Sequence, residues 1–505
     1  MKVQYLGSCV QKDIEERVRM VATAAGLSRY DGTVTQLYES RNDYDKNIKL
    51  IKRVFGMGHT SIVEHDYLVF ALEDVTPIIE QIIIGYRLTS FTIKSRRNVD
   101  FEKVGFYTPE FKTESGILLP NNAALQCEYQ EYMNGLFRRY GNLANAHIPL
   151  EDCRYVLPYS YHSNIIMGCD ANELYKMVGD LLYGNVSRIT EVRELGEKLE
   201  KLFKTYAPYV ANVLDGEENK TYYKNHMGFV QELVRANKGT DYLANVKLLD
   251  KVKMDSYTPN PDREILISSL QYMTQLSGDE CSILLDSLRD KETLKRFIEI
   301  ALSNPVDDET RSTLEELYNS ENPDFMGTMM RKIMESKNNR ELEHALFKFQ
   351  IPISLAVLTH YTRHRMHSLL VPNFFPLWNF DNYIIPSTIA KENEDYYRQI
   401  YAYNKEMMEK YRNCGVRDED LVYFYLSGHA CNITTVMDSK FITWLCSKRC
   451  CNKAQWETKD IADAIREYVR SVAPYLGENL GAPCEVWNKC PEGNDSCKAR
   501  GLVYK

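Results

Sequence analysis

Two stretches of the chain share one order of hydrophobic and polar positions. Each begins with Glu-His, continues as alternating apolar and polar residues, and ends in an apolar run; they are residues 64–90 (EHDYLVFALEDVTPIIEQIIIGYRLTS) and 343–368 (EHALFKFQIPISLAVLTHYTRHRMHS). The alternation has the period of a half-buried β-strand, and the apolar run after it is typical of a helix. A repeat of this length predicts a gene duplication with fusion.

We therefore expect two related domains, a first copy at residues 1–238 and a second copy at residues 239–505. The first opens with a predicted strand, VQYL, and VKLLDKV at 246–252 is predicted to be the matching strand of the second. Strands followed by helices in both copies predict an α+β or a mixed α/β fold.

The helix starts are also predictable. Thr76-Pro77 suits a helix start, because Thr can cap the helix and Pro fits its first position; Ser354 stands where Thr76 stands. The segment SFTIKSRRNVDF, from Ser90, is expected to be extended again. In the second copy, NPDRE predicts another helix start, and residues 261–345 are expected to be mostly helical, with breaks at Asn304-Pro305 and Asn322-Pro323.

Composition narrows the class of protein. A content of 44% hydrophobic and 26% charged residues is that of a soluble globular chain, and we expect neither a membrane span nor a signal peptide. The formal charge of −8 argues against a general nucleic-acid surface. With no secretion signal expected, the 13 cysteines indicate reduced thiols in the cytoplasm. The spacing of Cys484, Cys490 and Cys497 in the tail is not that of a zinc knuckle, so no metal is expected; a metal or redox role of these thiols is the alternative.

The sharpest local motif is Arg363-His364-Arg365, with Ser368 close behind. Guanidinium groups bind phosphate well, because they form bidentate, charge-assisted hydrogen bonds. The plainer interpretation is a solvated basic patch at a helix end, where the helix dipole favours positive charge.

This motif resembles the signature of the flavin-dependent thymidylate synthases, the ThyX family. That signature is Arg-His-Arg, two residues, Ser, four residues, Ser, one residue and Arg, with Gly-His-x-Ser/Thr-x-x-Glu-His upstream. The first copy is similar to the upstream motif at residues 58–65 (GHTSIVEH) and keeps Ser90, Ser95 and Arg97. The second copy is similar to the family at SKRCCNKAQWE (447–457) and in its tail, GAPCEVWNKCPEGNDSCK.

Each copy departs from the family where the other agrees with it. The first copy has Gly85-Tyr86-Arg87 in place of Arg-His-Arg but keeps Ser95, Arg97 and Arg154. The second copy keeps the residues Arg363, Arg365 and Arg449, and it has lost four others to Asn338, Asn373, Phe375 and Val422. Because family sites are built from neighbouring subunits, the resemblance implies one composite site shared by the two copies.

The resemblance implies methylation of dUMP at C5, with methylenetetrahydrofolate as one-carbon donor, FAD as cofactor and NADPH as reductant. It also implies an α+β fold with a mixed β-sheet flanked by helices in each domain, and a homodimer that forms a pseudo-tetramer. The implied nucleotide-binding residues are Ser95, Arg97, Arg154, His360, Arg363 and Arg449. The implied FAD contacts are Ser61, Glu64, Arg363, His364 and Arg365. Ser95, His59 and Arg449 are the implied catalytic residues.

Alternatives remain open at several of these positions. His59 can equally be a loop residue without a chemical role, and Glu64 can pair locally at the start of its strand. Asn98, Ile93 and His360 stand where the family has Tyr, Glu and Gln. These substitutions leave open another pyrimidine nucleotide, such as UMP. A non-catalytic protein that binds flavin or nucleotide is the further alternative.

Overall fold

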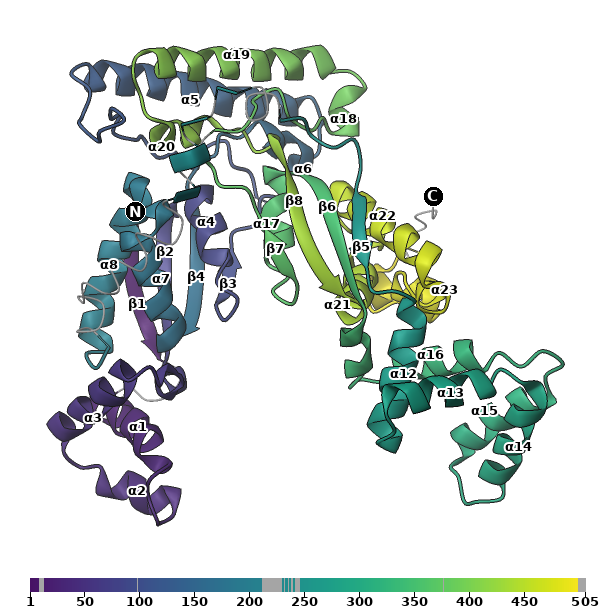
Figure 1. The fold of residues 1–505 in the computed structure, drawn as a ribbon. Coiled ribbons are helices and arrows are strands. Elements are labelled where there is room, and N and C mark those ends of the chain that lie inside the picture. The colour runs from purple at the N-terminus through teal and green to yellow at the C-terminus, as the bar shows by residue number, and fades with distance from the viewer. Residues whose placement is uncertain are drawn as a thin grey trace. The chain divides into compact units, whose positions relative to one another are not determined.

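The structure, a computed structural model, describes residues 1–8, 13–97, 99–210, 229–230, 232–234, 236–237, 239–240, 246–375 and 377–497. It divides into two compact units (Figure 1). Unit 1 comprises Met1–Leu248, Ser354–Arg363 and Pro372–Cys431. Unit 2 comprises Leu249–Ile353, His364–Val371 and Asn432–Lys505. Unit 1 therefore contains segments of both copies.

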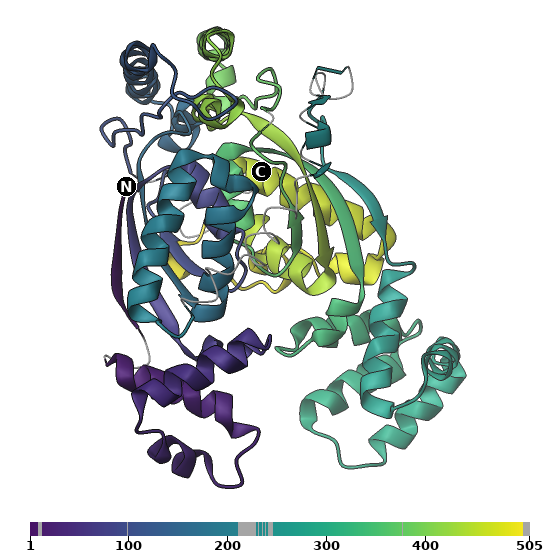
Figure 2. The ribbon, with the colours of Figure 1, turned by 60° about the vertical axis from the view of Figure 1, so that its left-hand side comes forward.

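Unit 1 is built on a four-stranded sheet of order β1-β2-β4-β3, in which every neighbouring pair is antiparallel. Its strands are β1 (Lys2–Ser8), β2 (Tyr67–Val75), β3 (Ser90–Ile93) and β4 (Ser163–Asp170). Side chains of β2 alternate between buried and partly exposed, as a strand with one face on the core requires. Helices α7 (Ala171–Tyr183) and α8 (Thr190–Tyr206) pack against this sheet (Figure 2).

The remaining elements of unit 1 come from both copies. Helix α4 (Pro77–Ile84) of the first copy packs against α17 (Leu355–Thr362) of the second. Helix α5 (Asn122–Asn145) lies beside α19 (Glu394–Asn413) (Figures 1 and 2). The other helical elements of unit 1 are α1 (Ile14–Leu27), α2 (Val34–Ser40), α3 (Tyr44–Gly56), η1 (Thr60–His65), α6 (Leu150–Cys153), η2 (Arg154–Val156), η3 (Asn185–Arg188), α18 (Ser387–Ala390), α20 (Asp418–Leu421) and η5 (Val422–Phe424).

Unit 2 repeats the same strand order, β5-β6-β8-β7. Its strands are β5 (Lys253–Tyr257), β6 (Leu346–Ser354), β7 (Ser368–Leu370) and β8 (Ala430–Asp438). Its helices are α12 (Pro261–Thr274), α13 (Gly278–Ser287), α14 (Lys291–Leu302), α15 (Asp308–Asn319), α16 (Phe325–Glu335), η4 (Arg340–His344), α21 (Ser439–Arg449), α22 (Trp456–Val472), α23 (Pro474–Glu478), α24 (Pro483–Val486) and η6 (Gly493–Asp495). In the part of the chain that the structure describes, no helix is long and apolar enough to cross a membrane.

The α+β prediction is confirmed, as are the opening strand, the strand–helix repeat and the two helix breaks of the second copy. The expectation of a mixed sheet is wrong for unit 1, because all its neighbouring strands are antiparallel. The predicted strand at 246–252 is wrong, because β5 begins only at Lys253. The segment from Ser90 is extended only as far as Ile93, after which the chain turns. The boundary between the copies remains a prediction, since residue 238 lies outside the described residues.

The predicted start of α4 is confirmed, but Thr76 does not cap the helix with its side chain. Its hydroxyl donates instead to Glu191 Oε2 at 2.6 Å, and its backbone N–H donates to Glu191 Oε1 at 3.0 Å. Tyr423 of the second copy donates to the same carboxyl group at 3.0 Å. Burial raises the pKa of Glu191 to about 7, although these donors lower it.

This buried carboxyl group makes stability depend on pH. The unfolded chain releases the Glu191 proton near pH 4.5, whereas the folded chain holds it to about pH 7. Unfolding therefore releases a proton in this range, and the contribution of Glu191 to the free energy of unfolding falls by at most about 3 kcal/mol as pH rises through it. Above pH 7 the contribution is constant.

Glu191→Gln should flatten this slope, because the amide cannot ionise. The measurement is urea unfolding at pH 5, 6, 7 and 8, followed by circular dichroism. Glu194→Gln, at a partly exposed position on the same helix, is the control and should keep the wild-type slope. Equal slopes for wild type and Glu191→Gln would contradict the raised pKa.

Candidate functional site

Three of the predicted nucleotide-binding residues of the first copy are linked around Glu151. Arg97, in the turn after β3, donates from Nε to Glu151 Oε2 at 2.7 Å. Arg154, the first residue of η2, donates from Nε to the Glu151 carbonyl at 3.0 Å. Ser95 is exposed, and its hydroxyl accepts from the Arg97 N–H at 3.3 Å. One residue of the short helix α6 thus orients both guanidinium groups.

Arg154 also joins the two copies. Its side chain is 1% exposed, and Nη1 lies 3.1 Å from His360 Nε2 on helix α17. A guanidinium group can only donate, so this ring nitrogen accepts and the imidazole is neutral in this contact. The contact connects a retained arginine of the first copy to the residue that stands in the second copy where the family has Gln.

Arg363 follows α17 directly and is half-buried. Burial lowers its pKa, and the positive charges of Arg96 and Arg154 lower it further, while Glu80 raises it. Its Nε is buried, with no hydrogen-bond partner among the described residues. A buried donor beside other cations is costly, and an anion would offset that cost.

A buried ion pair between Arg96 and Glu80 places a further cation near Arg363. Arg96 Nη1 donates to Glu80 Oε2 at 2.7 Å, and both side chains are nearly inaccessible to solvent. The same guanidinium donates to the Tyr161 hydroxyl and, at 2.8 Å, to Thr359 Oγ1 on α17. Burial by itself would lower the pKa of Arg96, but Glu80 raises it, so Arg96 stays charged.

Three further predicted residues belong to unit 2. Arg449, at the end of α21, contacts His364 Nε2 through Nε at 3.3 Å and Nη2 at 3.2 Å. The His364 ring meets the Trp444 ring edge to face, with centroids 4.7 Å apart. Arg365 is exposed. Unit 2 therefore brings together two of its three predicted residues.

The predicted flavin contacts of the first copy lie on or next to the 3₁₀ helix η1. His59 precedes this helix, and His59, Ser61 and Glu64 are all exposed. Glu64 Oε1 accepts a hydrogen bond from Asn172 at 2.9 Å. This partner lies far along the chain, so the bond is not the local pairing at a strand start that the sequence left open for Glu64. The roles of these three residues remain predictions.

The reciprocal positions are apolar. Phe375 is 2% exposed and Val422 is fully buried, where the first copy has Arg97 and Arg154. Phe374 stacks on Trp378 with centroids 5.6 Å apart, in the place that corresponds to Arg96. These buried side chains offer no positive charge to a phosphate.

Comparison with known proteins identifies the family. The model of a family described as thymidylate synthase complementing protein (Thy1) matches residues 10–209 and 283–475, together more than half of the chain. The chain belongs to the Thy1 family. It contains two Thy1 regions, which confirms the predicted tandem form.

Curated relatives of this Thy1 chain carry the name flavin-dependent thymidylate synthase. The protein of Nitratidesulfovibrio vulgaris is 30% identical over 180 residues, which cover 33% of this chain and 73% of the relative. The protein of Clostridium tetani is 26% identical over 270 residues, which cover 49% of this chain and 92% of the relative.

Two solved structures show a weak likeness to the Thy1 chain. The UMP/dUMP methylase PolB from Streptomyces cacaoi, bound with 5-Br dUMP, has a TM-score of 0.34 at 20% identity, covering 42% of this chain and 93% of PolB. ThyX from Helicobacter pylori, with FAD and dUMP, has a TM-score of 0.32 at 19% identity, covering 42% and 99%. A likeness this weak does not bear on the substrate of this chain.

Sequence reasoning missed four residues that organise the cationic group of the Thy1 chain: Glu80, Arg96, Glu151 and Thr359. Glu80 carried a usable signal, because a single carboxylate within the apolar run PIIEQIII needs a buried partner. Arg96 lies between two residues of the family signature and was overlooked for that reason. Glu151 and Thr359 carried no comparable signal in the sequence.

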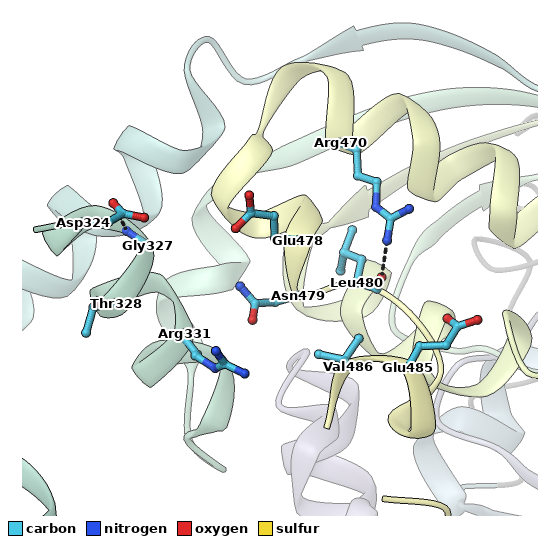
Figure 3. A pocket seen from close by; sticks show the side chains of 10 residues that line it. All are labelled: Asp324, Gly327, Thr328, Arg331, Arg470, Glu478, Asn479, Leu480, Glu485 and Val486. Carbon is cyan, nitrogen blue, oxygen red and sulfur yellow. Dashed lines mark hydrogen bonds between the residues drawn. The ribbon is translucent and has the colours of Figure 1, made fainter. Parts of the chain in front are cut away.

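A separate cavity of about 390 Å³ lies in unit 2, between α16 and the segment from the end of α22 to α24 (Figure 3). Its lining is polar and includes Arg331, Arg470 and Glu478. Arg470 donates to the Leu480 carbonyl at 3.2 Å, so it is held by the cavity wall. None of the predicted site residues lines this cavity.

The arrangement predicts opposite effects for two neighbouring arginines in the ligand-free protein. Arg96→Met should lower the free energy of unfolding by about 3 kcal/mol or more, because it leaves Glu80 buried and charged. Arg363→Met should leave it unchanged or raise it by up to about 1 kcal/mol, because it removes a like charge next to Arg96 and Arg154.

Urea unfolding followed by circular dichroism tests both variants. Arg53→Met, at an exposed position on α3, is the control and should stay within about 0.5 kcal/mol of wild type. Equal destabilisation by Arg363→Met and Arg96→Met would contradict the claim that Arg96 is stabilised by Glu80 while Arg363 is repelled by neighbouring arginines.

Proposed function

We propose that the chain is a flavin-dependent thymidylate synthase, which methylates dUMP at C5 to give dTMP. Methylenetetrahydrofolate supplies the one-carbon unit and NADPH the reducing equivalents. The observation that carries the proposal is the meeting of both copies at one cationic group: Arg154 of the first copy contacts His360 of the second, and Arg363 lies half-buried beside Arg154 and Arg96.

The phosphate of a nucleotide matches this group chemically. A phosphate monoester is close to dianionic at neutral pH and accepts several hydrogen bonds at once. It would give the buried Nε of Arg363 an acceptor and would offset the repulsion between Arg363, Arg96 and Arg154. Arg97, already oriented by Glu151, can contribute a further donor from its turn.

The pyrimidine contacts follow from the family resemblance. Ser95 is exposed beside Arg97, and we assign it a place next to the reacting base. Arg449 is assigned to the pyrimidine ring, where a guanidinium group stabilises negative charge that develops during the reaction. His59 is assigned a role in ordering water or assisting proton transfer. Arg449 belongs to unit 2, so its role rests on the resemblance alone.

The residues that would hold FAD carry functional groups that can bind a flavin nucleotide. Ser61 and Glu64 are exposed next to β2, and Arg365 is exposed in unit 2; a hydroxyl, a carboxylate and a guanidinium group suit the ribose, ring and phosphates of a flavin nucleotide. Arg363 and His364 complete the proposed set. FAD supplies the redox chemistry of the reaction. We also propose that two chains associate as a pseudo-tetramer.

A second pyrimidine nucleotide remains a candidate because of His360. Its Nε2 accepts from Arg154, and an imidazole cannot present a donor and an acceptor side by side, as the amide of the family's Gln does. Recognition of the base or ribose must therefore differ from that family pattern. UMP is the second substrate to test beside dUMP.

The decisive assay is tritium release from 5-tritiated dUMP in the presence of FAD, methylenetetrahydrofolate and NADPH. We expect a yellow purified protein and release that depends on both the folate and the reductant. Release from 5-tritiated UMP alone would identify the second candidate substrate. A yellow protein that releases tritium from neither nucleotide would contradict the proposed activity and favour a binding protein.

Arg154→Met should lower kcat/KM for dUMP about 100-fold, because it removes a buried, charge-assisted donor from the proposed phosphate site. Arg154→Lys should recover part of this loss, since it restores the charge without the bidentate geometry. Arg138→Met, at an exposed position on α5, is the matched control and should keep the wild-type value. A wild-type kcat/KM for Arg154→Met would exclude Arg154 from the site.

A further inference from the structure

We propose that Arg96, together with Glu80 and Thr359, positions helix α17 so that His360 and Arg363 face the residues of the first copy. This inference rests on the proposed function, because it concerns the same nucleotide site. Arg96 is a positioning residue: its guanidinium group is occupied by protein partners and acts on the nucleotide through α17.

The contacts of Arg96 span three elements of unit 1. Glu80 lies on α4, Arg96 lies in the turn that also carries Ser95 and Arg97, and Thr359 lies on α17 of the second copy. The distances are 2.7 Å from Arg96 to Glu80 and 2.8 Å from Arg96 to Thr359. Glu80 and Thr359 are completely buried, and Arg96 is 6% exposed. The Arg96 guanidinium group therefore connects the turn that carries Ser95 and Arg97 to helix α17 of the second copy.

The position of Thr359 on α17 determines which other side chains the Arg96–Thr359 hydrogen bond orients. His360 is the next residue, and Arg363 follows four residues after Thr359. Residues four apart lie on the same face of a helix, one turn from each other. A hydrogen bond that fixes Thr359 toward the first copy therefore also turns Arg363 toward Arg96 and Arg154, whose charges act on it.

The repeat provides an internal comparison that separates this role from packing. The positions that match Glu80 and Arg96 in the second copy are Leu358 and Phe374, which are buried and apolar. Phe374 packs on Trp378 and Tyr425 there. The fold thus accepts an apolar pair at this position.

The repeat offers two equivalent places for such a pair. The charged pair is present in the one beside Arg97, Arg154, His360 and Arg363, and the equivalent place is apolar. A buried ion pair often contributes little more to stability than apolar residues of the same size. Packing alone therefore does not require it, and its place beside the cationic group indicates a role in geometry.

The test copies the apolar pair into the first copy. Glu80→Leu combined with Arg96→Phe should fold, with a melting temperature near that of wild type, and should keep its FAD content. It should raise the dissociation constant for dUMP and the KM for dUMP at least 10-fold. Thr359→Val keeps the Glu80–Arg96 pair and removes only the acceptor on α17; a rise of several-fold in both constants is expected.

The matched control is Arg417→Met, which removes a largely buried guanidinium group from its 2.9 Å pair with Asp420 elsewhere in unit 1. It should change stability without changing the dissociation constant for dUMP. Binding is measured by equilibrium dialysis with labelled dUMP on FAD-loaded protein, beside the kinetic assay.

Three outcomes are distinguishable. Weaker binding by both Thr359→Val and the double variant, with FAD content unchanged, supports the positioning role. Wild-type dUMP binding by Thr359→Val overturns it, whether or not the double variant folds. Absence of dUMP binding by the wild type overturns the proposed function, and this inference with it.

Discussion

The fold and the proposed site both depend on how positive charge is held between the two copies. Arg96 and Arg154 lie close enough to Arg363 to lower its pKa by charge repulsion. Glu80 forms an ion pair with Arg96, and Glu151 orients Arg97 through its carboxylate and Arg154 through its backbone carbonyl. Without Glu80, the buried charge of Arg96 would have no anionic partner and would repel that of Arg363. A phosphate is the natural partner of the charge that remains.

The sequence predicted the strand–helix repeat well, because alternation in β2 and the apolar character of α4 and α17 are local properties. From the complementary losses it also predicted that Arg154 and the second copy share a site; Arg154 does contact His360 of the second copy, and the shared nucleotide site stays a prediction. It failed where partners are distant along the chain. Thr76 was expected to cap its own helix, yet it binds Glu191, which follows more than a hundred residues later.

The same limit explains the missed ion pair. Arg96 lies 16 residues after Glu80, beyond the end of α4 and strand β3, and Thr359 belongs to the other copy. Periodicity describes which face of an element is buried, but it does not say which polar group meets which across an interface. The strand predicted at 246–252 failed for a different reason: its apolar residues suit a strand, but ladder pairing with β6 begins only at Lys253.

Helices α5 and α19 come from different copies, and their contact has a consequence for the evolution of the gene. Tyr411 donates to the Leu125 carbonyl at 2.7 Å, and Tyr132 donates to Asn404 at 2.5 Å, so each helix supplies a hydrogen-bond donor to the other. As separate polypeptides, the two copies would have to associate by diffusion. If they were expressed at unequal levels, the copy in excess would remain without a partner. Tethering sets a constant one-to-one ratio and a high effective concentration. Once each half had lost its own arginines, reversal to independent genes carried a penalty that the ancestor never faced.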